Sequence, residues 1–233
     1  MNVHQQLMMS YPATAASSDW AFVTAQLNFV GAEGSSTITD DKGNSWTVSG
    51  NAHITTANPP PGCTSSLVLD GSGDWVQCVN MALFSPGTQD YTIQVAFRQL
   101  ASKNSALIDA YSGGQGYQLY MTGATGTTPN WYEGTSVVLE GTAISSSTWT
   151  MMTLSRKGGT TYLFADATLL SSQSTVRILT PDATIFALGA QVYSRNGSYD
   201  CNAQIGPFRF LIGKGLYDAS NPPSAISGPF PTS

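Results

Sequence analysis

The chain has 233 residues, of which 10% are charged and 10% aromatic, and its formal net charge is −5. Disordered proteins are charged and poor in aromatics, so this composition indicates a folded chain. The nine basic residues are scattered, which argues against a nucleic-acid partner, and no apolar run is long enough to span a bilayer, which argues against membrane insertion.

Residues 1–18 show no alternation of apolar and polar side chains and contain no charged residue. A basic region before a long apolar stretch is missing, so we do not interpret the segment as a signal peptide. We predict an N-terminal arm over 1–18 and a single domain over 19–233. The arm either docks on a neighbouring protein or covers an edge strand of its own domain.

Period-two alternation dominates the rest of the chain. Residues 91–98 place large apolar side chains on one face and Thr92, Gln94 and Arg98 on the other, which predicts a half-buried antiparallel strand. Residues 117–121 and 208–212 repeat the pattern. Residues 67–69 and 151–154 are more continuously apolar and suit strands covered on both sides. The predicted core residues are Leu67, Leu69, Ile93, Val95, Phe97 and Leu154.

Turn signals recur every eight to twelve residues or so, the spacing of a sandwich or barrel. The clearest lie at 41–44, 70–74 and 196–197, and Gly158-Gly159 predicts a two-residue hairpin because both positions tolerate positive φ. No stretch of helical period is present, and the proline-rich tail from Asn221 onward cannot pair in a central ladder. The predicted fold is all-β, a two-sheet antiparallel sandwich with minimal helix.

The three cysteines, Cys63, Cys78 and Cys201, lack metal-ligand spacing. Cys63 and Cys78 flank a predicted hairpin and would be able to pair in a secreted protein. Without a secretion signal, we expect all three thiols to be reduced.

Several segments, in order, resemble one known family. They are AQLNFVGAEGSSTITDDKGNSWTVSGNAHITT (25–56), SSLVLDGSGDWVQC (65–78), DYTIQVAFR (90–98), STWTMMTLSRKGGTTYLFAD (147–166) and the closing IGPFRFLIGKGLYDASNPPSAISGPFPT (205–232). Together they are similar to the concanavalin A-like lectin/glucanase superfamily, in the laminin-G-type form found in bacteriophage structural proteins. The resemblance covers roughly 19–233 and implies a jelly roll. Two positions depart from it: Gly206-Pro207 replaces an acidic pair, and Ala165-Asp166-Ala167 replaces a Val-Asn-Gly turn.

Catalysis by the glucanase branch needs paired carboxylates on one strand face. The chain has three glutamates, Glu33, Glu133 and Glu140, and none has an acidic neighbour at i+2 or i+4. His53 suits a solvent-facing strand position better than a catalytic base. We therefore expect no enzymatic activity and no catalytic residues.

Two loops place several oxygen ligands close together, as calcium prefers. Their candidate ligands are Asp40, Asp41, Asn44, Asp70 and Asp74. Neither loop matches the 12-residue calcium loop, and Asp and Asn also cap turns through their own backbone. We expect no cofactor, with calcium at these weak sites as the open alternative.

Aromatic side chains near amides and carboxylates are the usual elements of sugar sites. Two loop-like clusters meet this description, and they comprise Asn130, Trp131, Tyr132, Glu133, Tyr193, Asn196, Tyr199 and Asp200. The competing interpretation places these aromatics in the core or at a subunit contact.

The resemblance, together with the missing carboxylate pair, favours a non-enzymatic component of a phage virion: a capsid decoration, head-fibre or tail-associated protein. Its expected location is the virion, and its expected partners are other virion proteins, with a homo-oligomer and a host-surface glycan left open. The alternatives are a carbohydrate-binding adhesin or receptor-binding module and, further off, a polysaccharide hydrolase or lyase.

Overall fold

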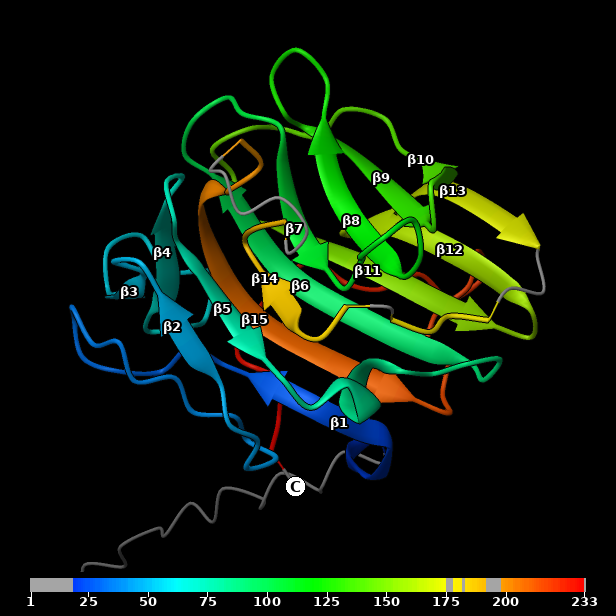
Figure 1. Cartoon of the computed structure of the whole chain (residues 1–233), viewed down its shortest axis with the longest axis horizontal. Helices are drawn as coiled ribbons and strands as arrows, with labels where there is room; N and C mark the ends of the chain where they lie inside the picture. The colour runs from blue at the N-terminus through cyan, green and yellow to red at the C-terminus, as the bar shows by residue number, and fades with distance from the viewer. Residues whose placement is uncertain (1–18, 175–177, 182, 192–197, 233) are drawn as a thin grey trace, which may run out of the picture.

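A computed structural model describes residues 19–174, 178–181, 183–191 and 198–232. Two antiparallel sheets pack face to face (Figure 1). Among these residues the only helices are the short 3₁₀ turns η1 (Trp20–Phe22) and η2 (Met81–Phe84), and none is long enough to cross a membrane. The sandwich and the near absence of helix agree with the sequence-based prediction.

The larger sheet, sheet A, has β15 near its centre. Its order is β13 (Thr168–Ser174), β12 (Thr160–Ala165), β11 (Thr150–Lys157), β6 (Tyr91–Gln99), β15 (Asn202–Ile212), β4 (Ser66–Asp70) and β3 (His53–Thr55), and β1 (Val23–Leu27) also pairs with β15. The predicted hairpin at Gly158-Gly159 joins β11 to β12, with φ of 59° and 84° at the two glycines.

The second sheet, sheet B, follows the order β10 (Ser136–Glu140), β9 (Thr128–Glu133), β8 (Tyr117–Thr122), β7 (Ser105–Asp109), β14 (Phe186–Leu188), β5 (Trp75–Cys78) and β2 (Thr47–Ser49). Strands β4 and β5 belong to different sheets, so the turn at 70–74 crosses the sandwich and the hairpin predicted there is wrong. All three cysteines are free thiols.

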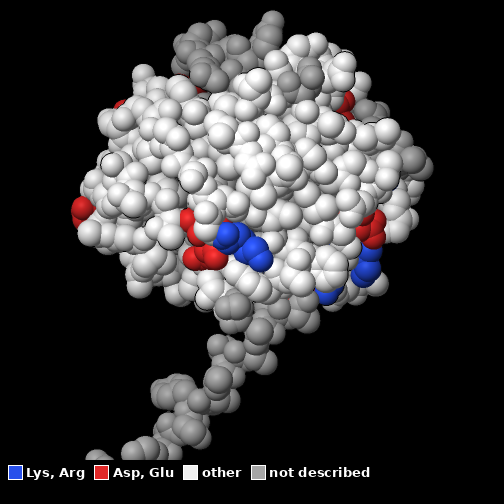
Figure 2. All heavy atoms as spheres, turned by 60° about the horizontal axis from the view of Figure 1, so that its bottom comes forward, with Lys and Arg blue, Asp and Glu red and all other residues white. Residues whose placement is uncertain are grey.

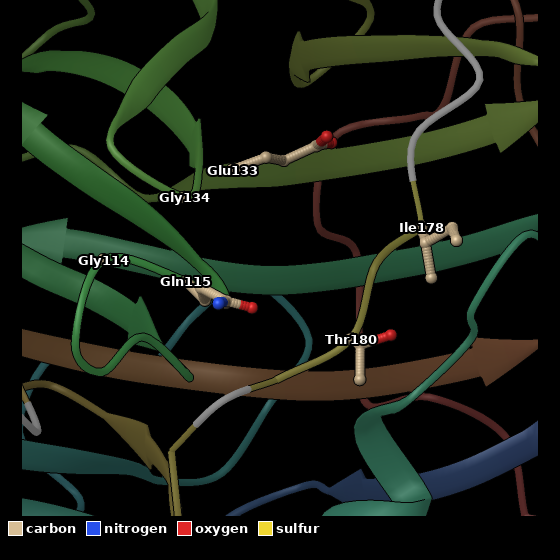
Figure 3. A pocket seen from close by; sticks show the side chains of 7 residues that line it. Gly114, Gln115, Glu133, Gly134, Ile178 and Thr180 are labelled. Carbon is tan, nitrogen blue, oxygen red and sulfur yellow. The ribbon is translucent and has the colours of Figure 1, made fainter.

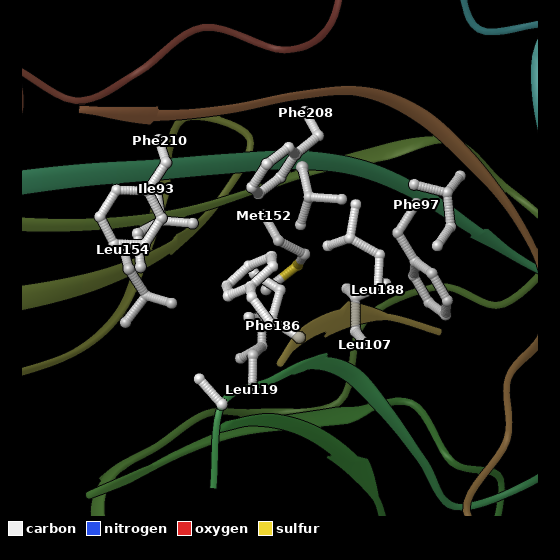
Figure 4. Close-up of a cluster of buried hydrophobic side chains, with 14 of the residues drawn as sticks. Ile93, Phe97, Leu107, Leu119, Met152, Leu154, Phe186, Leu188, Phe208 and Phe210 are labelled. Atoms are coloured by element: carbon white, nitrogen blue, oxygen red, sulfur yellow. The ribbon is translucent and has the colours of Figure 1, made fainter. Parts of the chain in front are cut away.

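The core lies between the sheets (Figure 4). The six predicted core residues are all 0–1% exposed except Phe97, which is 2% exposed, so the predicted strand register is correct. Aromatic rings fill the middle of the core: Phe84 stacks on Phe186 with 3.9 Å between ring centroids, and Trp46 meets both rings edge-on.

A bulge in β15 explains how Pro207 sits in a central strand. The pairing of β15 with β6 shifts register between Ile205 and Phe208, and a bulge tolerates the missing N–H of proline. Gly206 is required there because a Cβ would lie 2.5 Å from Cγ of Pro60. The departure of Gly206-Pro207 from the family pattern therefore has a local structural reason.

The C-terminal segment 213–232 crosses the outer face of sheet A. The backbone N–H of Leu216 donates to Oγ1 of Thr92 (2.9 Å), that of Tyr217 to Oγ of Ser155 (3.1 Å), and that of Phe230 to Oδ1 of Asn28 (2.8 Å). Strand β6 is therefore buried on both faces, not on one as predicted.

Candidate functional site

The outer face of sheet B carries a cluster of three tyrosines, which we call the tyrosine face. The ring centroids of Tyr120 and Tyr132 are 5.9 Å apart, and those of Tyr120 and Tyr199 are 5.3 Å apart. Tyr120 is nearly buried beneath the other two, whereas Tyr199 is 37% exposed and Tyr132 half-buried. Aromatic rings presented in this way offer apolar surface with hydroxyl groups at its rim.

Strand register brings these tyrosines together. Tyr120 on β8 lies opposite Asn130 on β9 and opposite Ala106 on β7. The N–H of Ala106 donates to the carbonyl oxygen of Tyr199 at 2.9 Å, which holds Tyr199 beside β7. Residues distant in sequence therefore meet because three neighbouring strands align.

Two amides flank the rings. Gln118, two residues before Tyr120 and opposite Tyr132, is 6% exposed, and its Oε1 accepts no hydrogen bond within the described part of the chain. Asn130 is already engaged: its Nδ2 donates to Oγ1 of Thr122 (3.0 Å), and its Oδ1 accepts the N–H of Gly141 (3.3 Å). Gln118 thus carries a buried, unsatisfied acceptor beside the aromatic cluster, and an acceptor of this kind calls for an explanation.

The hydroxyl of Tyr120 is a protonated donor. Burial, followed by the neighbouring Tyr199 and Asp109, raises the pKa of Tyr120 well above its ordinary value. A neutral phenol can both donate and accept a hydrogen bond, as a sugar hydroxyl does.

The predicted stretch 130–133 does not form one site, because successive residues of a strand point to opposite faces. Tyr132 and Asn130 face outward. Trp131 is 0% exposed and packs on Tyr117 in the core, with 5.3 Å between ring centroids, so its predicted role in stacking on a sugar is wrong.

Glu133 lines a cavity of about 560 Å³ at one open end of the sandwich, which we call the mouth (Figure 3). Its Oε1 accepts Nε1–H of Trp131 at 2.9 Å. The other walls come from the β7–β8 turn, through Gln115, and from the segment before β14, through Ile178 and Thr180. Glu133 is therefore separated from the tyrosine face by the thickness of sheet B.

The second predicted cluster is also divided. Tyr199 joins the tyrosine face, but Asp200 is 2% exposed and its Oδ2 accepts the N–H of Gly73 at 2.7 Å, which fixes the crossing turn. The predicted role of Asp200 in contacting a sugar is therefore wrong. Tyr193 and Asn196 lie outside the described residues.

In the first calcium candidate loop, the carboxylates of Asp40 and Asp41 already accept hydrogen bonds from N–H groups of the protein. Asp40 accepts from the N–H of Lys42 (2.7 Å), from Nδ2 of Asn44 (3.1 Å) and from Nε1 of Trp46 (2.8 Å). Asp41 accepts from the side-chain amides of Gln26 (3.1 Å) and Asn28 (2.8 Å), and burial raises its pKa.

The second calcium candidate loop is bonded in the same way. Asp70 accepts the N–H of Ser72 (2.8 Å), while Asp74 accepts those of Asn51 (2.7 Å) and Asp70 (3.0 Å). A cation at either loop would have to displace these N–H donors. The expectation of no cofactor, with calcium as the open alternative, stays a prediction that calcium titration would test.

Sequence reasoning missed Tyr120 and Gln118. Both belong to the alternating segment 117–121, where their parity places them opposite the core side chains Leu119 and Met121. Combining that parity with the β8–β9 register identifies the tyrosine face, and the register is not visible in one strand alone.

Comparison with known proteins gives one family match. The family model described as the concanavalin A-like lectin/glucanases superfamily matches residues 70–211. No curated protein matches the chain.

Several solved structures share the fold at low sequence identity. The binding domain of Paraclostridial Mosquitocidal Protein 1 is 12% identical with a TM-score of 0.66, over 86% of this chain and 51% of that one. Domain 4 of AbnA, an extracellular arabinanase from Geobacillus stearothermophilus solved in complex with arabinotriose, is 16% identical with a TM-score of 0.62, over 85% and 95%.

The binding domain of botulinum neurotoxin DC in complex with SialylT is 13% identical with a TM-score of 0.60, over 88% and 50%. The chain thus spans about half the length of the toxin binding domains and nearly all of the arabinanase domain.

Proposed function

This chain belongs to the concanavalin A-like lectin/glucanase superfamily, and on that premise we propose that it is a non-catalytic glycan-binding module. The observation that carries the proposal is the tyrosine face: Tyr132 and Tyr199 around Tyr120, with the unsatisfied Oε1 of Gln118 beside them. Pyranose rings stack their apolar faces on such aromatics, and amides take the hydroxyls. One of the similar structures was solved in complex with arabinotriose and another in complex with SialylT, which supports the proposal.

The positions of the glutamates support a role without catalysis. Glu140 pairs with Asn130 and shares its outward face, whereas Glu133 faces the mouth. Because Glu140 lies opposite Asn130, and Asn130 and Glu133 are three residues apart, the backbone positions of the two glutamates are separated by about 10 Å along the strand. A retaining glycosidase needs its two carboxylates about 5–5.5 Å apart on one side of the substrate. Glu33 is bound at another loop, by the N–H of Thr56 at 2.6 Å.

A glycan array followed by calorimetry tests the proposal, with arabinotriose and SialylT as the first soluble probes. We expect Tyr132→Ala and Tyr199→Ala each to weaken binding of the best ligand about tenfold, which is 1.4 kcal/mol. Tyr162→Ala, which removes a half-buried tyrosine from β12 of sheet A, is the matched control and keeps full affinity. Equal losses in all three variants would contradict a site on the tyrosine face.

A reducing-end assay addresses catalysis with the same glycans. We expect no release of product by the unmodified protein. Turnover by the unmodified protein that disappears in Glu133→Gln or Glu140→Gln would show that the protein is a hydrolase and would contradict the proposal of a non-catalytic module.

The second candidate is a structural component of a phage virion, as a capsid decoration, head-fibre or tail-associated protein. It is favoured by the resemblance of the closing segment 205–232 to phage structural proteins and by a surface with few charges (Figure 2). Purified particles from the source, analysed by mass spectrometry and by labelling with antibody against this chain, test it. The two candidates are compatible if the glycan belongs to the host surface.

A further inference from the structure

The strands of sheet B contain acidic residues and no basic ones. Their three charged residues are Asp109 on β7, Glu133 on β9 and Glu140 on β10, and none of the seven described strands contains Lys or Arg. Asp109 is 0% exposed, and Glu133 lines the cavity at the mouth. Glu140 is therefore the charged residue of these strands that is exposed on the outer face of the sheet.

Strand register places Glu140 beside the tyrosine face. Tyr120 on β8 lies opposite Asn130 on β9, and Asn130 lies opposite Glu140 on β10, so the three side chains share one face. Tyr132 is two residues from Asn130 and is therefore the diagonal neighbour of Glu140 across the strand pair. Diagonal neighbours lie about 7–8 Å apart, within reach of long side chains. A sugar ring stacked on Tyr132 therefore comes within reach of the Glu140 carboxylate.

The carboxylate of Glu140 accepts no hydrogen bond from the residues that the structure describes. Asn130, directly opposite, donates its Nδ2 to Oγ1 of Thr122 (3.0 Å) instead, and the ion pairs between described residues involve other carboxylates. An exposed carboxylate is well solvated, so its freedom alone does not indicate a ligand. Its position beside three aromatic rings does.

The rings of the tyrosine face also have no cation of the protein over them. Every cation–ring contact in the described part of the chain involves Trp20, Phe22 or Phe230, and none of these belongs to the tyrosine face. The face of an aromatic ring attracts positive charge. The surface thus combines rings that favour a cation with an accessible carboxylate, and the strands beneath it supply no positive charge for an acidic ligand.

We propose that the tyrosine face binds an amino sugar with a free, protonated amine, and that Glu140 is the residue that selects the amine. A hydrogen bond between an ammonium and a carboxylate is stronger than one from a hydroxyl, so the amine gains more from Glu140 than a hydroxyl at the same ring carbon. An acidic sugar is repelled by the same carboxylate. The inference rests on the proposed function and deepens it by naming the class of sugar and the residue that recognises it.

The probes are the glucosamine trimer, the N-acetylglucosamine trimer and cellotriose, which share one linkage and differ in an ammonium, an acetamide or a hydroxyl at one ring carbon. Calorimetry on the full chain at mildly acidic pH keeps the amine protonated. We expect the glucosamine trimer to bind about tenfold more tightly than the other two. The preference should shrink as salt is added, because salt screens exposed charges. Equal binding of the three probes, or no binding of the glucosamine trimer, overturns the proposal.

Two variants of one residue test the selection. Glu140→Gln keeps the shape and removes the charge, and it should lower the affinity ratio of the glucosamine trimer to cellotriose to about one. Glu140→Lys should reverse the preference. Glu33→Gln, which makes the same charge change on the loop bonded to Thr56, is the matched control and keeps the ratio. Because Glu140 is exposed, we expect both of its variants to fold. A ratio that Glu140→Gln leaves unchanged, or that falls equally in Glu33→Gln, overturns the role of Glu140.

The outcomes separate this inference from the proposed function. A glycan that binds through Tyr132 and Tyr199 without preference for an amine refutes only the selection by Glu140. Binding of the glucosamine trimer that requires Glu140 but survives Tyr132→Ala and Tyr199→Ala refutes the stacking on the tyrosine face. Binding of no glycan at all refutes both proposals.

Discussion

The outer faces of the two sheets differ in how far they are covered by the rest of the chain. On sheet A, the polar side chains Thr92, Gln94 and Thr153 are 0–3% exposed because the C-terminal segment covers them. On sheet B, Tyr132 and Tyr199 remain accessible, and the C-terminal segment does not cross them. The same sandwich core therefore supports one face closed by its own chain and one face that presents aromatic rings.

The difference indicates on which face a binding site can change with little loss of folding stability. Polar side chains on the covered face hydrogen-bond to one another and to the covering segment, so each substitution there disturbs a network. Rings on the open face contact mainly each other, and the core beneath them is already complete. We expect substitutions on the covered face of sheet A to lower stability, and substitutions on the tyrosine face to weaken binding of the glycan proposed for it.

The largest expected effect separates the two sides of β9. Trp131→Ala should lower the free energy of unfolding by about 3–5 kcal/mol because it empties a fully buried site. Tyr132→Ala, one residue away on the outer face, should change it by less than about 1 kcal/mol. Urea denaturation measures both, and a similar loss in both variants would mean that the tyrosine face is part of the core.

A smaller effect tests the covering segment. Ile226 is 8% exposed and packs with Ala96 and Met151 on sheet A. Ile226→Ala should lower the free energy of unfolding by about 2 kcal/mol, the low end for such truncations, because the site is near the surface. Ser224→Ala in the same segment is the control. A change in Ile226→Ala no larger than in this control would show that the segment does not close the face.

The smallest effect concerns pH. The ion pair with Lys157 and the hydrogen bonds from Ser220 lower the pKa of Asp218 below its ordinary value of 3.8. A carboxyl with a lowered pKa in the folded state stabilises the fold above its ordinary pKa, and this contribution is lost as the pH falls through the folded value. Asp218→Asn should therefore lower Tm slightly at pH 7 and flatten its decline below pH 4.

A double-mutant cycle provides the control for this prediction. Lys157→Met should give the same loss at pH 7, and combining it with Asp218→Asn should add little. Additive losses would show that the two side chains act independently.

The sequence patterns were sufficient for the class of fold and for the core-facing side of the strands that contain 67–69, 93–97 and Leu154. Alternation identified Ile93, Val95 and Phe97 as buried, because period-two patterning and burial have one cause. Alternation alone does not reveal that the outer face of β6 is also covered, since the covering segment at 213–232 lies more than a hundred residues away in sequence.

The candidate site was only partly predictable for a related reason. Tyr132 and Tyr199 were identified as aromatic residues near amides and carboxylates, but Trp131 and Asp200 were grouped with them by sequence adjacency. Adjacent residues in a strand face opposite ways, so adjacency is a poor guide to a shared surface. The link through Tyr120 depends on pairing between strands, which a single sequence does not encode locally.

The central position of β15 has a consequence for synthesis of the chain. Oγ1 of Thr24 on β1 donates to the carbonyl of Phe210 on β15, a pair separated by 186 residues. At ribosomal rates of about 5–20 residues per second, β1 waits roughly 10 to 40 seconds for this partner. Strands β4 and β6, which also pair with β15, have open edges for part of that interval. The nascent polypeptide is thus most exposed to misassociation just before β15 leaves the exit tunnel, and a pause in translation upstream of residue 202 would lengthen that exposure.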